Sequence, residues 1–462
     1  MSRVLLITTT TGYQTRAFEE AAARAGVDLV YATDRCKGLD DPWRDHAIPV
    51  RFHDGPASVR AVVDAARGRA LDGIVALGDR PAVLAARVAQ ALRLKGHPPH
   101  AAEAAASKLL TRGRFVAAGL PVPWFFSMPL DASLDEVADR LAFPCVVKPL
   151  ALAGSRGVIR ADTPDEFVSA VARLRAILLG PDVRTMEDPA NDEILVEGYA
   201  AGAEYALEGV LEDGALRVLA IFEKPDPLEG PFFEETIYAT PPRLAHDAQR
   251  ALAGTIAHAA AALGLRHGPI HAECRVGENG VFVLEVAARP IGGLCARALR
   301  FVTKTQDGLT LEDLLLRHAL GEPLDGYGRE RAASAVMMIP IPRRGHFRGV
   351  DGVEDARRVA GVEDVLVTAK VGQLMLPLPE GHSYLGFIFA RAEHTPEAIA
   401  AVREAHRRLD FRFDVALPLA PGRVDVGRGF SPAGVAPGLR RGCAAVGRGF
   451  SPAGVAPGVA LT

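Results

Sequence analysis

The sequence predicts a protein of several domains that mixes α/β and α+β structure, with a parallel α/β domain at its N-terminus. A chain of 462 residues is long enough for about three domains. Short apolar strands alternate with helical patterns through about residue 100, which is typical of a parallel α/β unit. Hydrophobic residues make up 49% of the chain and charged residues 24%, so the composition is that of a globular protein with buried cores.

The first domain is expected over residues 1–100. The runs "RVLLITT", "VDLVYAT" and "DGIVALG" predict strands, whereas "YQTRAFEEAAARAG" and "RPAVLAARVAQALRL" have helical periodicity. The fingerprint GxGxxG is missing after the first strand, where "TTTTGYQT" stands, so we do not expect a dinucleotide there. The apolar run at the N-terminus is too short for a secretion signal or a membrane span.

The middle of the chain alternates strands, loops that contain glycine, and helices. A helical segment ends at Gly119, and "FPCVVKPLALAGSRGVIRA" predicts a strand, a loop and a second strand. Further strands follow in "DEILVEGYAAGAEYALEGVLEDGALRVLAIFEK", with a turn at Asp213 and Gly214, and "HDAQRALAGTIAHAAAALGL" predicts a helix.

The C-terminal part changes character from about residue 333. "SAVMMIPIP", "VEDVLVTA" and "SYLGFIFARA" predict strands and "TPEAIAAVREAHRRL" a helix, so residues 333–420 are expected to form a small α+β domain. Residues 421–462 contain "VGRGFSPAGVAPG" twice. Their Gly, Pro and Ala content buries too little apolar surface to fold, so we expect a disordered tail.

Charge and cysteine usage limit the classes of partner. The net charge of −3 gives no indication of a nucleic-acid ligand, and we expect small-molecule substrates and no membrane attachment. The five cysteines form no CxxC pair and have no companion histidine cluster, which argues against a zinc site and against a disulfide framework. This pattern fits a cytoplasmic protein. A homodimer is left open.

The stretch "GPIHAECRVGENGVFVLEVAARP" predicts a hairpin with acidic side chains on both arms. Because side chains two apart share a strand face, His271, Glu273 and Arg275 lie on one face, and Glu285 and Arg289 share a face of the other arm. A three-residue loop would place Glu273 directly opposite Glu285. A two- or four-residue loop would displace them by one position, and the sequence alone does not fix this register.

Two carboxylates opposite each other repel and need a compensating charge. Carboxylate oxygens suit Mg²⁺ held between protein and phosphate, and Arg289 adds a planar donor fork for phosphate or carboxylate oxygens. The other interpretation is a solvated hairpin in which Arg289 neutralises Glu285, and these residues alone favour neither.

A second feature points to phosphate. Lys148 ends the apolar run "CVVKP", and Gly154, Ser155 and Gly157 follow in a loop whose backbone N–H groups could approach phosphate oxygens. Such loops are common between strands and are weak evidence alone. The chain has no GxxxxGK[ST], which excludes a P-loop.

Taken in order, Lys108, Lys148, "GSRGV", "VEGYAAGAE", Glu273 and "LEVAARP" resemble the ATP-grasp superfamily of carboxylate–amine ligases. The chain is most similar to its amino-acid ligase branch, the bacilysin-type dipeptide ligases, which "FEKPDPLEGPFFEETIYATPP" and "LPEGHSYLGFIFARAEHTPEAI" also resemble. The likeness runs from the first strand to about Phe413. It implies the ATP-grasp fold, with a Rossmann-like domain at residues 1–100, an ATP-grasp domain at 101–332 (a lid at about 120–198 and a larger part at 199–332), and the α+β domain at 333–420.

The resemblance also implies roles in binding ATP. Lys108 and Lys148 would contact the phosphates and the adenine edge, and the loop from Gly154 to Gly157 would close over the phosphates. Glu197 and the backbone through Tyr199 would form the hinge that reads the adenine, and Glu204 would hold the ribose. A surface position for Lys108 and a solvated one for Glu204 are the alternatives.

The same resemblance implies a metal and substrate site. Glu273 and Glu285 would bind Mg²⁺, or Mn²⁺ in its place, Arg289 would contact the acyl phosphate, and His271 and Gly292 would lie on the substrate side. The alternative for His271 is a histidine satisfied by hydrogen bonds beside a core strand. Lys224 either reaches the γ-phosphate or is an ordinary charged loop residue. Many family members have asparagine where this chain has Ala287, which leaves one metal ion or two.

The function that these features imply is an ATP- and Mg²⁺-dependent ligase. It would activate a carboxylate as an acyl phosphate and join it to an amine, as an amino-acid or dipeptide ligase does. The alternatives are an ATP-grasp carboxylase and a non-catalytic protein that binds nucleotide or amino acid. No biotinyl-lysine motif is present, and both glutamates and Arg289 are, which favours the ligase.

Overall fold

The computed structural model describes residues 1–9, 14–34, 47–278 and 280–415, which belong to one compact unit. The tail expected at residues 421–462 lies outside these ranges and stays a prediction. Cys36 and Cys443 also lie outside them. The three described cysteines, Cys145, Cys274 and Cys295, are free and buried.

The N-terminal segment forms the predicted parallel α/β structure. A four-stranded sheet has the order β3–β2–β1–β4, with strands Ile48–Pro49, Asp28–Thr33, Arg3–Thr8 and Gly73–Leu77. The helices are α1 (Thr15–Ala25), α2 (Gly55–Ala66) and α3 (Asp79–Leu92). Only Gly78 separates β4 from α3, so Asp79 lies at the carboxyl end of a parallel strand and opens a helix. This edge of a parallel sheet is where ligands usually bind.

Two helices lead into a smaller α/β layer over the segment expected to be the lid, and we call its sheet the lid sheet. They are α4 (Pro99–Ala106) and α5 (Lys108–Ala117), separated by Ser107, whose side chain caps α5. The lid sheet has the antiparallel order β5–β8–β6–β7, with strands Phe125–Pro129, Glu193–Gly198, Cys145–Pro149 and Ile159–Ala161. Helix α6 (Pro164–Leu178) packs on this sheet through buried side chains such as Phe167 and Leu174, and the short α7 (Pro181–Arg184) follows it. Short 3₁₀ turns lie at Leu134–Glu136, Ala138–Arg140 and Pro189–Asp192.

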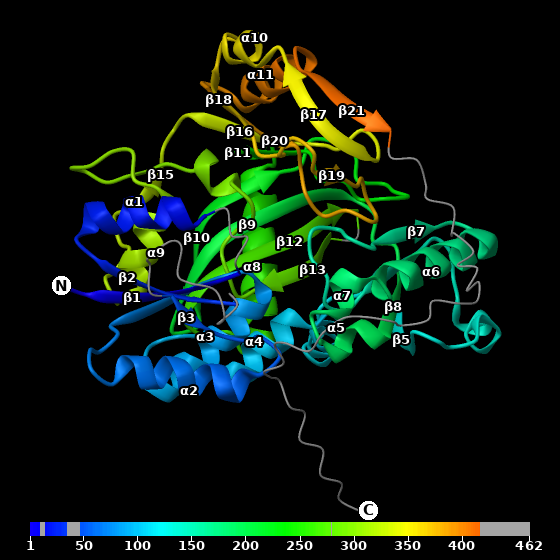
Figure 1. Ribbon diagram of the computed structural model, residues 1–462, viewed down its shortest axis with the longest axis horizontal. Helices are drawn as coiled ribbons and strands as arrows, with labels where there is room; N and C mark the ends of the chain where they lie inside the picture. The colour runs from blue at the N-terminus through cyan, green and yellow to red at the C-terminus, as the bar shows by residue number, and fades with distance from the viewer. Residues whose placement is uncertain (10–13, 35–46, 279, 416–462) are drawn as a thin grey trace, which may run out of the picture. The chain divides into compact units, whose positions relative to one another are not determined.

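The centre of the molecule is an eight-stranded antiparallel sheet in the order β13–β12–β9–β10–β11–β16–β20–β18 (Figure 1). In chain order its strands are Ala203–Glu212 (β9), Ala215–Glu223 (β10), Ile237–Thr240 (β11), Gly268–Gly277 (β12), Gly280–Ala287 (β13), Ala333–Ile339 (β16), Val362–Val367 (β18) and Gly386–Ala392 (β20). Helix α8 (His246–Leu263) covers part of it. Strand β11 pairs with β16, so the sheet runs across the domain boundary expected at residue 333 without a break.

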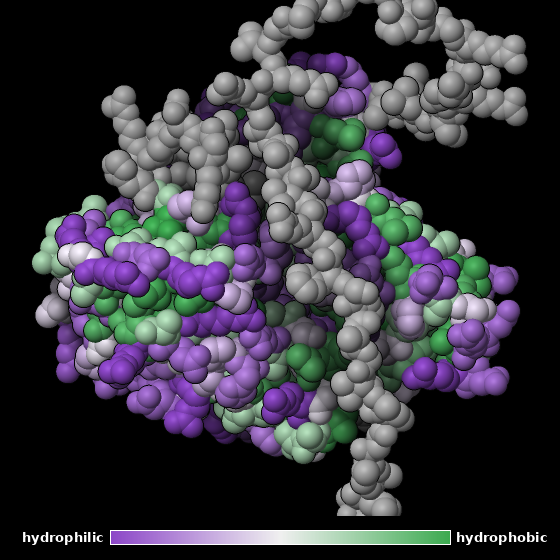
Figure 2. Space-filling view, turned by 60° about the horizontal axis from the view of Figure 1, so that its bottom comes forward, coloured by the Kyte–Doolittle hydropathy of each residue, from purple (hydrophilic) through white to green (hydrophobic). Residues whose placement is uncertain are grey.

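The remaining elements complete the C-terminal side. A small sheet has the order β19–β17–β21, with strands Leu374–Met375, Gly345–Asp351 and Asp410–Val415. The helices are α9 (Leu311–Ala319), α10 (Val353–Arg357) and α11 (Thr395–Arg407); β14 (Phe301–Val302) pairs with β15 (Gly328–Arg329), and a 3₁₀ turn spans Cys295–Ala298. In the ranges described, no helix is both long and apolar enough to cross a membrane. Hydrophilic and hydrophobic side chains are intermixed on the face shown in Figure 2.

Candidate active site

One cavity of about 330 Å³ gathers nearly all of the predicted site residues. Of those residues, it is lined by Lys108, Lys148, Gly154, Ser155, Glu197, Tyr199, Glu204, His271, Glu273, Glu285, Arg289 and Gly292. Gly157 is not among its lining residues. The walls come from the lid strands β6 and β8, the large sheet and the C-terminal segment, so side chains far apart in the sequence meet here.

The hairpin of β12 and β13 places Glu273 directly opposite Glu285. Gly277 pairs with Gly280, which leaves two residues between them, and a loop of that length alone would displace the glutamates. A β-bulge restores the register: Cys274 pairs with Val283, so Leu284 is the extra residue on β13. Arg112 donates to the carbonyl of Leu284 at 3.0 Å. The facing arrangement therefore exists, although it depends on the bulge and not on a three-residue loop.

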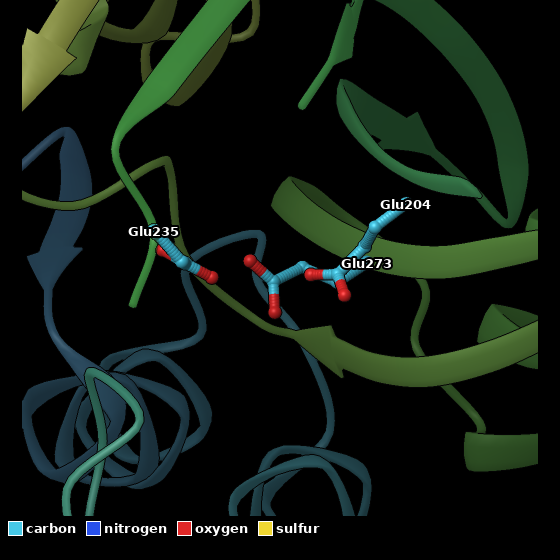
Figure 3. A group of neighbouring side chains, drawn as sticks. All are labelled: Glu204, Glu235 and Glu273. Atoms are coloured by element: carbon cyan, nitrogen blue, oxygen red, sulfur yellow. The ribbon is translucent and has the colours of Figure 1, made fainter. Parts of the chain in front are cut away.

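Three carboxylates converge at this hairpin, two from strands β9 and β12 and one from the segment before β11. Ligand oxygens of Glu204, Glu235 and Glu273 all lie within 4.8 Å of one another (Figure 3). Glu235, just before β11, was not predicted from the sequence, because nothing local links an acidic pair in "FFEETIY" to strands elsewhere in the sheet.

Lys224 neutralises this carboxylate cluster. Its ammonium donates to Glu204 and Glu235 at 2.6 Å each and to Glu273 at 2.8 Å, and its side chain is 2% exposed. Burial alone would lower the pKa of Lys224, but the three carboxylates raise it well above its ordinary value. The interpretation of Lys224 as an ordinary loop residue is therefore wrong.

The carboxylates of the cluster differ in their protonation. Burial and then the nearby charge of Glu273 raise the pKa of Glu235 to about 7. Burial would also raise the pKa of Glu273, but Lys224 and His271 outweigh it and hold that pKa well below its ordinary range. Glu273 therefore stays ionised more readily than Glu235, as a metal ligand must.

The donor set fits a magnesium ion. Glu285 is half-buried, and its one ionic contact among the described residues is to Arg289 at 4.0 Å, which leaves its oxygens free to bind. Oxygen donors of this kind suit Mg²⁺ better than softer metals. Ala287 lines up with His271 and offers no ligand atom, so any further ligands must come from phosphate or water.

Arg289 is already bonded on one side by a residue that the sequence did not point to. Its guanidinium makes two bonds to the carboxylate of Asp79, at 2.8 and 3.3 Å. Burial would raise the pKa of Asp79, but the Arg289 charge holds it below its ordinary value. On an ideal strand, residues four apart such as Glu285 and Arg289 would be too far apart to pair. Strand β13 ends at Ala287, before Arg289, and Nη2 of Arg289 lies 4.0 Å from Oε1 of Glu285.

The predicted adenine hinge carries a buried ionic cluster. Glu197 accepts from Arg112 at 2.9 and 3.3 Å and also pairs with Lys148. Burial would raise the pKa of Glu197, but these two cations lower it to about 2. Burial lowers the pKa of Lys148 despite this partner. Arg112 was not predicted, although it lies on the same helix as Lys108.

The loop after Lys148 is turned in part away from the cavity. Gly154, Ser155 and Gly157 have φ values of +65°, +55° and +74°. The Gly157 amide donates to the carbonyl of Pro379 at 2.9 Å, and a Cβ there would lie 2.8 Å from Leu174. The Gly157 amide is thus already bonded in this structure, and its expected contact with phosphate stays a prediction. Lys108 is half-buried and donates to the Leu152 carbonyl at 2.9 Å, beside the loop.

His271 lines the cavity and lies between two carboxylates. Its Nδ1 bonds Glu208, and its Nε2 is 3.5 Å from Glu273. Burial would lower the pKa of His271, but Glu208 and Glu273 raise it to about 9. Glu208 also accepts from the Ile291 amide at 3.1 Å. The alternative, a histidine satisfied by hydrogen bonds, describes His271 better than the predicted role in binding substrate.

Comparisons with known proteins agree with this architecture. Three family models match the chain: an ATP-grasp N-terminal domain at residues 18–96, an ATP-grasp domain at 141–298 and an L-amino acid ligase C-terminal domain 2 at 337–414. In structure, the chain is similar to an L-amino acid ligase from Bacillus licheniformis, with a TM-score of 0.76 and 27% identity over 90% of this chain and 99% of that one.

Curated relatives match a smaller share of the chain. The uncharacterized protein y4rH of Sinorhizobium fredii is 26% identical over 70% of this chain and 65% of its own length. A D-alanine–D-alanine ligase of Ralstonia pickettii is 26% identical over 48% of this chain and 64% of its own length. The chain thus spans less than two thirds of the length of these curated relatives.

Proposed function

The chain belongs to the ATP-grasp superfamily, and on this premise we propose that it is an ATP- and Mg²⁺-dependent ligase that joins the carboxyl group of one amino acid to the amino group of another molecule. The observation that supports this proposal most directly is the single cavity that unites Glu273 and Glu285 with Arg289 and Lys148. A cytoplasmic location, expected from the sequence, stays a prediction, and a homodimer stays open.

The reaction that fits this site has two steps. An oxygen of the substrate carboxylate attacks the γ-phosphorus of ATP, the bond to the β-phosphate oxygen breaks, and ADP leaves an acyl phosphate behind. The amine then attacks the acyl carbon, phosphate departs with the bonding electrons, and the amine loses a proton as the amide forms. Catalysis of this kind depends on positioning and charge neutralisation more than on covalent chemistry.

The residues divide this work according to their charge. Glu273 and Glu285 would hold Mg²⁺, which would neutralise phosphate charge during the transfer. Lys148 and Lys108, at the lid side of the cavity, suit the ATP phosphates. Arg289 bonds Asp79 twice and the Pro290 carbonyl once, and its other N–H donors would face the oxygens that gain charge as the acyl phosphate forms. The pKa of Glu235, about 7, lies near neutrality and suits this carboxylate to accept the proton of the amine.

The experiment that tests the proposal is a screen of amino-acid pairs for ADP release with Mg²⁺, followed by the mass of the product. A ligase forms ADP only when both substrates are present and yields a mass equal to their sum less one water. ADP release that needs bicarbonate and no amine would instead indicate a carboxylase. Binding without ADP release by the pure protein would indicate a non-catalytic binder.

A further inference from the structure

A second cavity, of about 550 Å³, lies on the large sheet and shares no lining residue with the first. Its walls come from the start of β16, the end of β20 and residues 361–363, where the edge strand β18 begins. Met338 and Phe387, toward the other ends of β16 and β20, line the first cavity instead. The two cavities therefore lie at opposite ends of one pair of strands.

Arg391, on β20, lines the second cavity and has a donor that the protein does not use. Its Nε donates to Glu363 at 2.9 Å and its Nη1 bonds Glu330. Its Nη2 is buried and has no hydrogen-bond partner within the described ranges. A buried N–H group of a charged side chain is costly to leave without a partner, so Arg391 has donor capacity left for a ligand.

A β-bulge brings one carboxylate to two arginines. The register of β18 against β20 slips by one residue between Val362 and Asp364, so Glu363 is the extra residue of the bulge. Its Oε1 lies 2.9 Å from Nε of Arg391 and also 2.9 Å from Nη2 of Arg300. A single carboxylate oxygen thus serves two guanidinium groups.

Four arginines gather around this cavity, and we call Arg300, Arg329, Arg331 and Arg391 the arginine cluster. Arg331 lines the cavity at an exposed position. Arg329 donates to the carbonyl of Ala332, which also lines the cavity, at 2.7 Å. Among the residues that the structure describes, neither Arg329 nor Arg331 forms an ion pair.

The acidic residues near the cavity do not balance the arginine cluster. Glu330 pairs with Arg391, and Glu363 serves Arg391 and Arg300, so two partly buried carboxylates face four guanidinium groups. Glu393 also lines the cavity, but its side chain is 86% exposed and water screens its charge. Two of the four positive charges therefore have no fixed counter-charge.

The excess charge acts on Arg391 in particular. Burial, and then the charges of Arg300 and Arg329, lower the pKa of Arg391 to about 10. Arg391 is therefore still protonated near pH 7, but its neighbours repel it. An anion in the cavity would relieve this repulsion, because an opposite charge stabilises the protonated form.

We propose that this second cavity binds a doubly charged oxyanion of the phosphate class, either inorganic phosphate or the phosphate group of a small ester. Two uncompensated guanidinium charges match a phosphate dianion, and the planar guanidinium binds phosphate oxygens through paired N–H donors. Ala332, Val362 and Ala392 add apolar lining for the organic part of an ester. The site does not depend on the proposed ligase function.

Calorimetric titration of the full chain with inorganic phosphate and with glycerol 3-phosphate, at constant ionic strength, tests the proposal. Arg331→Gln and Arg329→Gln each remove a cation that has no acidic partner. Arg60→Gln, at an exposed position of α2, is the matched control. We expect binding to weaken about tenfold in each test variant, as for the loss of one charge-assisted hydrogen bond, and to stay within about twofold in Arg60→Gln. The ligand that binds the wild type more tightly identifies the source of the phosphate group.

A further variant separates the two cavities, because the first cavity also contains cations. Binding that weakens in Arg331→Gln and Arg329→Gln, but not in Arg289→Lys or Arg60→Gln, supports the proposal. Any other pattern overturns it, including no binding by the wild type, or tighter binding of succinate than of either phosphate compound. Melting temperatures show whether each variant folds. Arg331 is exposed, so Arg331→Gln decides the question if Arg329→Gln does not fold.

Discussion

The ammonium of Lys224 lies 2.8 Å from a carboxylate oxygen of Glu273, the same carboxylate that faces Glu285 across the hairpin. Lys224 follows β10, whereas Glu273 lies on β12, two strands away across the large sheet. A fixed positive charge thus occupies the centre of the acidic cluster. If Lys224 is removed, a divalent cation can take its place, and the resulting change in stability can be measured.

Lys224→Met should destabilise the protein without Mg²⁺ and make its stability depend strongly on Mg²⁺. Removing the ammonium takes away the buried cation that the three carboxylates share, a loss of about 3–5 kcal/mol for comparable pairs. Glu204 then keeps only Arg275 and Glu273 only His271 as a buried cationic partner. A divalent cation can then take the vacated centre and stabilise the folded state by mass action. Thermal unfolding with and without Mg²⁺ measures both effects.

The exposed Lys304 provides the control for that experiment. Lys304→Met should shift the melting temperature little and leave its dependence on Mg²⁺ as in the wild type. An equal response to Mg²⁺ in Lys224→Met and the wild type would show that the three carboxylates do not form a cation site, whatever the loss of stability.

Glu285→Ala should abolish Mg²⁺-dependent ADP formation and leave the fold intact. The side chain is 30% exposed and its one ionic contact among the described residues is weak, so little stability depends on it. Loss of a metal ligand should lower kcat by about 100-fold or more. Glu278→Ala, at the exposed turn of the same hairpin, is the matched control and should keep full activity. Undiminished turnover in folded Glu285→Ala would remove Glu285 from the metal site.

The hairpin could be predicted from the sequence because it depends on residues that are close together in the chain. Side chains two apart on a strand share a face, so the period of two placed Glu273 and Glu285 on their arms. The bulge at Leu284 was beyond such reasoning, since a bulge depends on contacts such as the one from Arg112. Lys224 and Glu235 could not be joined to the hairpin for the same reason: their contacts depend on the order of strands in the sheet.

Arg289→Lys should lower kcat strongly and leave the KM for ATP nearly unchanged. Lysine keeps the positive charge but loses the planar guanidinium. Only the guanidinium can bond both oxygens of Asp79 and at the same time donate to the substrate. Arg297→Lys, at a half-exposed guanidinium paired with Asp364, is the control and should leave both constants as they are. Normal kcat with a raised KM for ATP would place Arg289 on the nucleotide.

Asp79→Asn should act through Arg289. The amide keeps the size of the carboxylate but accepts only one of the two guanidinium bonds, so we expect kcat to fall about tenfold, less than in Arg289→Lys. If the two residues act as a unit, the double variant loses no more activity than Arg289→Lys alone. Independent, additive losses would show that Asp79 does not position Arg289.

Asp79 also marks a limit of sequence reasoning. It is separated from Arg289 by 210 positions and opens a helix of the N-terminal domain, where the sequence predicted neither a dinucleotide nor any other site. A parallel strand followed by one glycine and an acidic residue is only weak evidence of a ligand-binding site. Only the packing of the N-terminal domain against the β12–β13 hairpin brings that acid to the active site.

A cluster of histidines outside the cavity predicts that the protein loses stability in mild acid. His97, His267 and His318 are buried, the rings of His267 and His318 are stacked 4.3 Å apart, and neither nitrogen of His267 has a hydrogen-bond partner within the described ranges. Burial, with the neighbouring histidines, lowers the pKa of His97 and of His318 to about 4.

The sign of the effect follows from proton uptake. Between pH 6.5 and about 4 the unfolded chain binds a proton at each of these histidines and the folded protein does not, so stability is full above pH 6.5 and falls as the pH drops toward 4. Each of His97 and His318 contributes on the order of 3 kcal/mol to stability over this range.

The variant His318→Phe keeps an aromatic ring against His267 but cannot be protonated. Its free energy of unfolding, measured with denaturant at pH 7 and pH 4.5, should therefore fall less with acid than that of the wild type, whereas His394→Phe, at an exposed position, should fall as much. Equal losses in His318→Phe and the wild type would mean that His318 already carries a proton in the folded protein, in conflict with its burial.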